Sequence, residues 1–161
     1  MKLFATIRTW LTWQGNGPPT LPHACVRHTG TAKGRGVYAL RAFREGEVIE
    51  VCPVVVLGKP YEALPAEIQK LVFMWERREG SPDIQALALG YGSLYNNDNP
   101  ANVRYEPDRS ALALRFIAVR DISANEELTV NYSGDPDAED WWFKDKSIEP
   151  IIGAGGERGE Q

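Results

Sequence analysis

The chain alternates apolar and polar positions in short runs that are bounded by Gly and Pro. Runs of this kind are typical of short, half-buried strands. They predict strands near residues 37–40, 47–51, 84–89, 111–119 and 128–132. Pro53 and Pro60 bracket the apolar run that ends at Leu57, which favours an edge or terminal strand because proline cannot donate to a sheet. The pattern therefore predicts a mainly β domain.

One stretch has a helical period instead. Its apolar residues follow the i, i+3, i+4, i+7 spacing of an amphipathic helix, at Ile68, Leu71, Val72 and Trp75. Pro65 suits a first helical turn, and the Gly-Ser-Pro sequence at 80–82 ends the pattern. The spacing predicts one helix from Pro65 to Arg78, inside an insert of about residues 60–90.

Two runs of the chain repeat each other. Residues 39–51 (ALRAFREGEVIEV) match residues 118–130 (AVRDISANEELTV), each residue of the second run lying 79 positions after its counterpart. Gly46 and Asn125 occupy the same place in the two runs, and these residue types tolerate a positive φ best. We therefore expect both runs to build the same strand-turn-strand corner.

The ends of the chain do not share this pattern. Residues 1–22 are rich in Trp, Thr, Gly and Pro, which predicts an irregular N-terminal arm. The chain closes on GAGGERGEQ, which offers nothing apolar to bury, so a disordered tail is predicted over residues 146–161. The 161 residues suit one domain, here expected over residues 23–145.

Composition limits the partners and the compartment. The longest aliphatic stretch, Val54–Leu57, is far too short to cross a membrane, and the net charge of −4 argues against direct nucleic-acid binding. Cys25 and Cys52 form no CxxC pair, and with His23 and His28 they lack the second ligand cluster that a zinc site needs, so no metal is predicted. These features favour a reducing compartment, the cytoplasm, although a nuclear location or delivery into a host stays open.

Three segments carry candidate chemistry. The first is Gly34-Arg35-Gly36, which precedes a strand and so does not fit a phosphate loop that opens a helix. The second is residues 96–102 (NNDNPAN), whose amide side chains both donate and accept hydrogen bonds. The third is residues 126–132 (EELTVNY), a strand that ends in Tyr132. Each segment alone is compatible with a turn, a solvated loop or an ordinary strand.

Taken in order, these three segments resemble the signature of SET-domain lysine methyltransferases. They are similar to the family's GxG, NHSCxPN and EELTxDY motifs, and the likeness covers about residues 30–135. The resemblance implies a β-clip of small sheets with one inserted helix. It also implies a pseudoknot, in which the asparagine segment and the chain before Tyr132 thread together.

The resemblance implies a methyl transfer from S-adenosylmethionine, which leaves as S-adenosylhomocysteine, to a protein lysine. Tyr132 is expected at the mouth of the lysine channel, with Tyr105 as a second channel tyrosine that favours monomethylation. Asn96 is expected to bond the methionine part of the cofactor, and the backbone of Asn97 its adenine edge. The residues expected to contact the cofactor are Lys33, Gly34, Arg35, Gly36, Asn96, Asn97, Tyr132 and Trp142.

The chemistry accounts for these residue types. Displacement at a sulfonium needs alignment of amine nitrogen, methyl carbon and sulfur. An aromatic channel beside a cation lowers the pKa of the incoming lysine, and tyrosine faces attract its ammonium form. The resemblance implies a protein substrate such as a histone or another basic protein. Acidic residues follow Tyr132 at 135, 137, 139 and 140, which either favour such a basic segment or form a solvated acidic loop. The oligomeric state is not predicted.

The sequence also departs from the family. Asn97, Asp98 and Asn131 replace its His, Ser and Asp, and no cysteine-rich zinc module is present. Trp141-Trp142-Phe143 is the candidate lid of the cofactor pocket, or else a segment that packs on the core. Two alternatives stay open: a SET-like module that binds a peptide or the cofactor without catalysis, and a structural β domain without a ligand.

Overall fold

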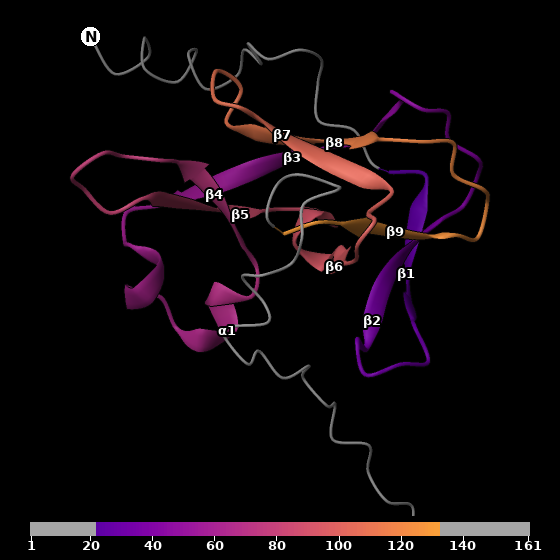
Figure 1. Ribbon diagram of the computed structural model, residues 1–161, viewed down its shortest axis with the longest axis horizontal. Coiled ribbons are helices and arrows are strands. Elements are labelled where there is room, and N and C mark those ends of the chain that lie inside the picture. Colours follow the sequence, from indigo (N-terminus) through magenta and orange to yellow (C-terminus); the bar gives the residue numbers. More distant parts are fainter. Residues whose placement is uncertain (1–21, 133–161) are drawn as a thin grey trace, which may run out of the picture.

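The computed structural model describes residues 22–132 (Figure 1). The predicted N-terminal arm up to residue 21, the tail and the lid at Trp141-Trp142-Phe143 lie outside the described residues. The described part is built mainly from strands, as the sequence predicts. Nine strands are joined by short turns and three short helical segments.

The elements follow one another closely along the chain. The strands are β1 (Ala24–His28), β2 (Arg35–Ala39), β3 (Val48–Leu57), β4 (Val72–Glu76), β5 (Ile84–Ala88), β6 (Asn96–Asn97), β7 (Val103–Asp108), β8 (Ala113–Ala118) and β9 (Glu127–Val130). The helical segments are η2 (Tyr61–Ala63), α1 (Ala66–Gln69) and η3 (Gly92–Leu94). All predicted strand runs correspond to an observed strand, with ends that differ by a few residues.

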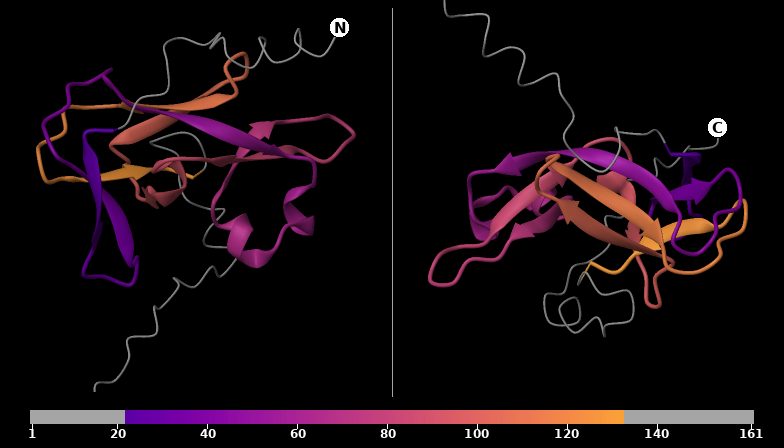
Figure 2. Two further views of the ribbon diagram at one scale, coloured as in Figure 1. Left: turned by 180° about the vertical axis from the view of Figure 1, so that it is seen from behind. Right: turned by 90° about the horizontal axis from the view of Figure 1, so that it is seen from above.

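The strands pair in the order β1-β2-β9-β7-β8-β3-β5-β4, and β6 also pairs with β9. The β1–β2 and β4–β5 hairpins therefore lie on opposite sides of the molecule, which the views in Figures 1 and 2 show. Most pairs are antiparallel, but β6 and β7 run parallel to β9. These parallel pairs bring the asparagine segment against the chain that leads to Tyr132, as expected for the SET fold.

β3 bridges two of the small sheets. Val48–Pro53 pair with β8, and Val54–Leu57 pair with β5. Each half has one partner strand in the described structure, so the predicted edge position agrees with the pairing. Pro53 lies where the partner of β3 changes from β8 to β5, and its carbonyl accepts the Leu89 N–H (2.9 Å).

The predicted helix is much shorter than expected. Its first turn forms as α1, but the extension to Arg78 is wrong because Val72–Glu76 is strand β4. In β4, Phe73 and Trp75 are buried while Met74 between them is exposed, a period of two. Pairing with β5 decides the outcome, because β-branched and aromatic side chains fit a pleated surface that packs on a core.

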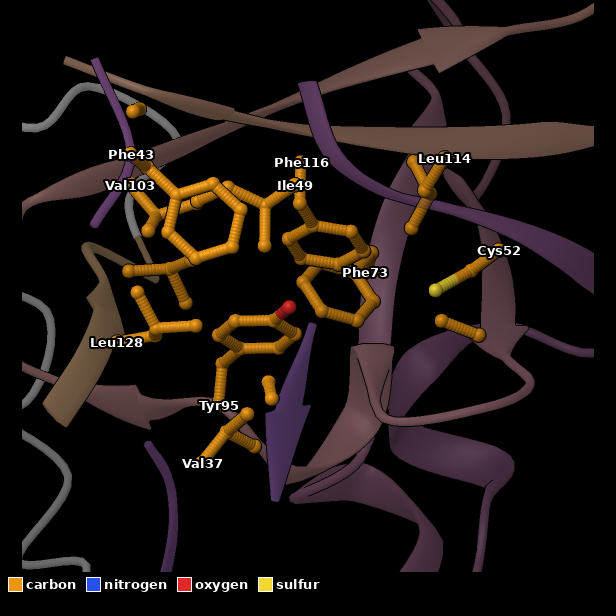
Figure 3. Close-up of a cluster of buried hydrophobic side chains, with 14 of the residues drawn as sticks. Val37, Phe43, Ile49, Cys52, Phe73, Tyr95, Val103, Leu114, Phe116 and Leu128 are labelled. Atoms are coloured by element: carbon orange, nitrogen blue, oxygen red, sulfur yellow. The ribbon is translucent and has the colours of Figure 1, made fainter. Parts of the chain in front are cut away.

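The core lies where the small sheets meet. Its centre is an aromatic cluster in which Tyr95 stacks on Phe116 (centroids 4.6 Å apart), and Phe73 lies edge-on to Phe116 (5.9 Å). Figure 3 shows the Tyr95 ring surrounded by these rings and by aliphatic side chains from β2, β7 and β9. Tyr95 directly precedes β6, so the packing of its ring fixes the start of the asparagine segment.

The two repeated runs form one pseudo-symmetric unit. We call residues 39–47 the first corner and residues 118–126 the second corner. Phe43 and Ile122 exchange two N–H···O bonds (2.9 Å each) at the centre of the unit. The flanking bonds are also matched, from Gly46 N–H to Ala118 O (2.9 Å) and from Asn125 N–H to Ala39 O (2.7 Å). Gly46 (φ 78°) and Asn125 (φ 69°) both adopt the predicted positive φ.

Candidate active site

The candidate site is assembled around β9. β2 pairs with β9 through Val37 and Leu128, and β6 pairs with it through Asn96 and Asn97. The glycine segment, the asparagine segment and the chain before Tyr132 are far apart in the sequence. The sheet order nevertheless makes them neighbours in space.

Gly36 is the point where the three segments approach most closely. A Cβ at this position would lie 2.3 Å from Oε1 of Glu127 and 2.9 Å from Nδ2 of Asn96. Nδ2 of Asn96 donates to the same Glu127 oxygen (2.7 Å) and to the Arg35 carbonyl (2.9 Å). Only glycine leaves room for this arrangement. The Asn96 side-chain amide nitrogen is thus held by the protein through two hydrogen bonds.

Lys33 joins the glycine segment to the asparagine segment. Its Nζ donates to the Asn97 carbonyl (2.9 Å) and lies 3.8 Å from Oδ1 of Asp98. The turn that carries Lys33 is closed by a bond from Thr29 N–H to Gly34 O (2.7 Å). The cation of Lys33 therefore stands at the same edge as Asn96 and Asn97, in a part-exposed position.

Asn97 holds the residue that ends the third motif. Its Oδ1 accepts the backbone N–H of Tyr132 (2.9 Å). The Tyr132 hydroxyl donates to the carbonyl of Tyr95 (2.9 Å), which is the residue before Asn96. Burial of the ring's hydroxyl end raises the pKa of Tyr132 to about 12, although 37% of the whole residue's surface is exposed. At neutral pH this hydroxyl keeps its proton and uses it in the hydrogen bond to Tyr95.

Tyr105 lies on β7 at the same end of the sheet. Val103 of β7 pairs with Val130 of β9, and Tyr105 and Tyr132 each follow that pair by two residues. The Tyr105 ring packs edge-on against Phe73 with centroids 4.8 Å apart, and burial raises the pKa of its hydroxyl. The register thus places both tyrosines toward the same end of β7 and β9.

Asn102 pins β9 to the asparagine segment. Its side chain accepts the Thr129 N–H (2.8 Å) and donates to the Glu127 carbonyl (2.7 Å) and to Oε1 of Glu126 (3.0 Å). Asn102 is buried, so these three bonds replace contacts with water at both of its amide atoms. The asparagine that closes the second motif therefore has a structural role.

Most of the predicted site residues lie together. Lys33, Arg35, Gly36, Asn96, Asn97 and Tyr132 are linked by the contacts given above, and Gly34 lies between the first two. Trp142 lies outside the described residues. The sequence interpretation missed Glu127, which orients Asn96, and Glu50, which bonds the Tyr95 hydroxyl (3.1 Å). Glu127 lay within a quoted motif, and Glu50 was a charge inside an apolar strand pattern.

Comparison with known proteins agrees with this architecture. Residues 34–133 match the family model of the SET domain. The chain is 33% identical over 118 residues to a histone-lysine N-methyltransferase of Schizosaccharomyces pombe specific for lysine 37 of histone H3, covering 71% of this chain and 74% of that protein.

Solved structures share the fold at lower identity. A Plasmodium falciparum protein described as a candidate histone methyltransferase is 24% identical with a TM-score of 0.54, over 70% of this chain and 98% of that one. The methyltransferase domain of the human histone-lysine N-methyltransferase SETMAR is 22% identical with a TM-score of 0.50, over 70% and 45%. At these identities the likeness concerns the fold.

The chain belongs to the SET-domain family. Its predicted function, protein-lysine methylation, is confirmed by the family match and by the curated relative. Within residues 22–132, no helix combines the length and the apolar character needed to cross a membrane.

Proposed function

We propose that this methyltransferase uses S-adenosylmethionine and binds it between the β1–β2 turn and the asparagine segment. The observation that carries the proposal is that the Asn96–Glu127 hydrogen bond lies so close to Gly36 that no Cβ fits there without a shift, with Lys33 bonded to Asn97 beside them. These residues come from three segments that are far apart in the sequence. The SET domain is proposed to span residues 23–145.

The residues at this edge suit the methionine part of the cofactor. An ammonium group needs acceptors, and Oδ1 of Asn96 and the nearby main-chain carbonyl of Arg35 provide them. A carboxylate needs donors or a cation, and Lys33 and Arg35 supply positive charge. The Asn97 main chain is proposed to meet the adenine edge, and Trp142, beyond the described residues, to cover the pocket.

The proposed reaction is a direct displacement. The cofactor supplies an electrophilic methyl carbon; the lysine nitrogen forms the new N–C bond while the S–C bond breaks and its electron pair stays on sulfur. The protein must therefore deliver a neutral amine in line with that bond. Tyr132 and Tyr105 are proposed to line the channel, where low polarity favours the uncharged amine. The lysine proton leaves to solvent before the transfer.

The tyrosine hydroxyls are proposed to orient the amine. Burial keeps both of them protonated, since it raises the pKa of Tyr132 to about 12 and also raises that of Tyr105. Protonated hydroxyls in a narrow channel restrict the room for further methyl groups. We therefore propose monomethyl-lysine as the main product, and abundant trimethyl-lysine in a mass spectrum would contradict this.

The replacement of the family's histidine by Asn97 is compatible with activity. The Asn97 side chain accepts the Tyr132 N–H, and its main-chain carbonyl accepts a hydrogen bond from the Lys33 ammonium group. Both contacts link residues of the candidate site. This geometry favours an enzyme over the alternative of a SET-like module without catalysis. Asn97→Ala should weaken catalysis through Tyr132 rather than through loss of the fold.

The substrate is proposed to be a lysine in a basic protein segment. The curated relative from S. pombe acts on histone H3, so a histone tail is the first candidate. The acidic residues that follow Tyr132 would attract such a segment, and direct nucleic-acid binding is not part of the proposal. Free Cys25 and Cys52 suit a reducing compartment, with the cytoplasm or nucleus proposed.

Calorimetric titration of the full chain with S-adenosylmethionine and S-adenosylhomocysteine tests the proposal. We expect saturable binding of both, weakened by about tenfold or more in Asn96→Ala, because a hydrogen bond to a charged group is worth about 1.5–3 kcal/mol. Gln85→Leu, a buried change on β5 away from the site, is the control and should bind normally. Binding without methyl transfer to any histone would favour the non-catalytic module.

A further inference from the structure

Glu50 is a buried carboxyl group without a cation. Only 2% of its surface is exposed, and none of the ion pairs formed within residues 22–132 involves it. Burial raises its pKa, against hydrogen bonds from the Tyr91 N–H and from the side chains of Cys52 and Tyr95. A buried polar group of this kind costs stability unless its hydrogen bonds are made. An apolar residue at this buried strand position would avoid that cost. The presence of a carboxyl group therefore suggests a role other than stability.

The chain is shaped around this carboxyl group. Its Oε1 accepts the Tyr91 N–H (3.0 Å), and its Oε2 accepts the Tyr95 hydroxyl (3.1 Å). Gly90 passes so close that a Cβ there would lie 2.5 Å from Oε1. The turn before η3 therefore closes directly onto Glu50, and both carboxyl oxygens are held at fixed places.

The contact with Tyr95 leads to the candidate active site. The Tyr95 ring is fixed at its face by stacking on Phe116 and at its hydroxyl by Glu50. The carbonyl of the same residue accepts the Tyr132 hydroxyl (2.9 Å). Two contacts thus hold the ring, and the ring and the carbonyl that Tyr132 uses belong to the same residue.

We propose that Glu50 is a positioning residue for Tyr132, acting through the ring and carbonyl of Tyr95. Glu50 touches no reacting atom; it keeps the Tyr132 hydroxyl in one orientation. This inference rests on the proposed function, since it concerns the same channel. Asn96 follows Tyr95 but has its own anchors at Arg35 and Glu127, so cofactor binding should depend little on Glu50.

Steady-state kinetics with a histone-tail peptide test the inference. In Glu50→Leu we expect kcat to fall about three- to tenfold, the worth of one hydrogen bond of about 0.5–1.5 kcal/mol, with peptide KM and cofactor Kd within about twofold. Glu50→Gln keeps a group that can bond both Tyr91 and Tyr95, so it should restore kcat to within about twofold of the original chain.

Two further variants separate positioning from loss of stability. Gln85→Leu also replaces a buried polar side chain, with 7% of the residue's surface exposed, on β5 where Gln85 pairs with Leu57 and Met74. It should lower stability without lowering kcat. Tyr95→Phe removes the hydroxyl that Glu50 accepts, so it should lower kcat like Glu50→Leu, and the double variant should be no worse than either single one.

The outcomes are distinct. An original chain that neither binds S-adenosylmethionine nor transfers a methyl group would overturn the proposed function itself. An active chain in which Glu50→Leu and Gln85→Leu have equal kcat would overturn only the role of Glu50. Additive losses in the Glu50→Leu, Tyr95→Phe pair would also overturn it, because they would exclude a shared path.

Discussion

The two corners have nearly the same structure, but the strands that follow them differ in their roles. In each, an arginine side chain donates to a glutamate six residues later, Arg41 to Glu47 and Arg120 to Glu126, both at 2.6 Å. The same glutamates accept a backbone N–H within their own turn, from Arg44 (3.0 Å) and from Ser123 (2.9 Å). Local sequence therefore determines the corner, and the corner alone does not determine function.

The difference begins with the strands that follow. The first corner leads into β3, where Val48 and Pro53 are scaffold residues. At the matching positions, 79 residues later, the second corner leads to Glu127, which orients Asn96, and to Tyr132. A repeated scaffold thus leads to candidate site residues in one copy. In the other copy it leads to Glu50, the residue proposed to position Tyr132.

The largest effect is expected on cofactor binding from Gly36→Ala. This change affects Glu127 in β9, the strand after the second corner, and leaves the strand after the first corner untouched. Its methyl group would have to displace Glu127 and Asn96, with contacts of 2.3 and 2.9 Å before any adjustment. We expect cofactor affinity to fall by about tenfold or more, since both anchors of the pocket move. Calorimetry measures it, and an unchanged Kd would mean that Asn96 is not a cofactor ligand.

The next effect concerns the matched turns. Gly46→Ala and Asn125→Ala each place alanine at a positive φ, which should lower the free energy of unfolding by about 1 kcal/mol in either corner. Urea denaturation measures this loss. Only Asn125→Ala should also weaken cofactor binding, because Glu127 follows two residues later. Equal binding losses in the two variants would contradict a functional difference between the corners.

A smaller effect is expected on acidification. Hydrogen bonds from Arg41 and from the Arg44 N–H lower the pKa of Glu47 below its ordinary value of 4.5. Burial alone would raise the pKa of Glu126, but hydrogen bonds from Arg120, Ser123 N–H and Asn102 outweigh it and lower the pKa.

Carboxylates with lowered pKa values stabilise the fold above their unfolded pKa and lose this contribution as the pH falls. Glu47→Gln and Glu126→Gln should each cost less than about 1 kcal/mol at pH 7, because the pairs are part-exposed. Each should also flatten the loss of stability below pH 4.5. Thermal melts from pH 3 to 7 measure this loss of stability. A melting temperature that falls more steeply with acidification in the variants than in the original chain would contradict the account.

The smallest effect has the opposite sign. Burial raises the pKa of Glu50, so its contribution to stability is complete below the unfolded pKa and is lost as the pH rises through the folded pKa. Glu50→Gln removes this dependence. The melting temperature of Glu50→Gln, relative to that of the original chain, should therefore be higher at neutral pH than at acidic pH. A constant difference would mean that Glu50 does not titrate in the folded chain over this range.

Local features could be predicted from the sequence. The corners depend on short-range bonds and on two residues that accept a positive φ, so the repeat was enough to place them. The order of the three motifs was enough to indicate the SET fold. The fate of Val72–Glu76 could not be predicted in this way, because pairing with β5 outweighs a helical spacing that only four apolar residues supported.

The contacts that support the candidate site also could not be predicted from the sequence. Glu50 and Tyr95 are 45 residues apart, and only the packed core brings the carboxyl group to the hydroxyl. Asn97 replaces the family's histidine, and the sequence did not indicate that its side chain holds the Tyr132 backbone. Contacts of this kind depend on how side chains turn after the strands have paired.

The most direct test of the central claim compares the original chain with Tyr132→Phe in transfer of a radiolabelled methyl group to histone tails. We expect label on a lysine, located by mass spectrometry, and a fall of about 10²-fold in kcat for the variant because the amine is less well aligned, with cofactor binding and melting temperature nearly unchanged. Absence of transfer by the original chain, despite cofactor binding, would contradict the account. Equal transfer by both proteins would contradict the role of Tyr132.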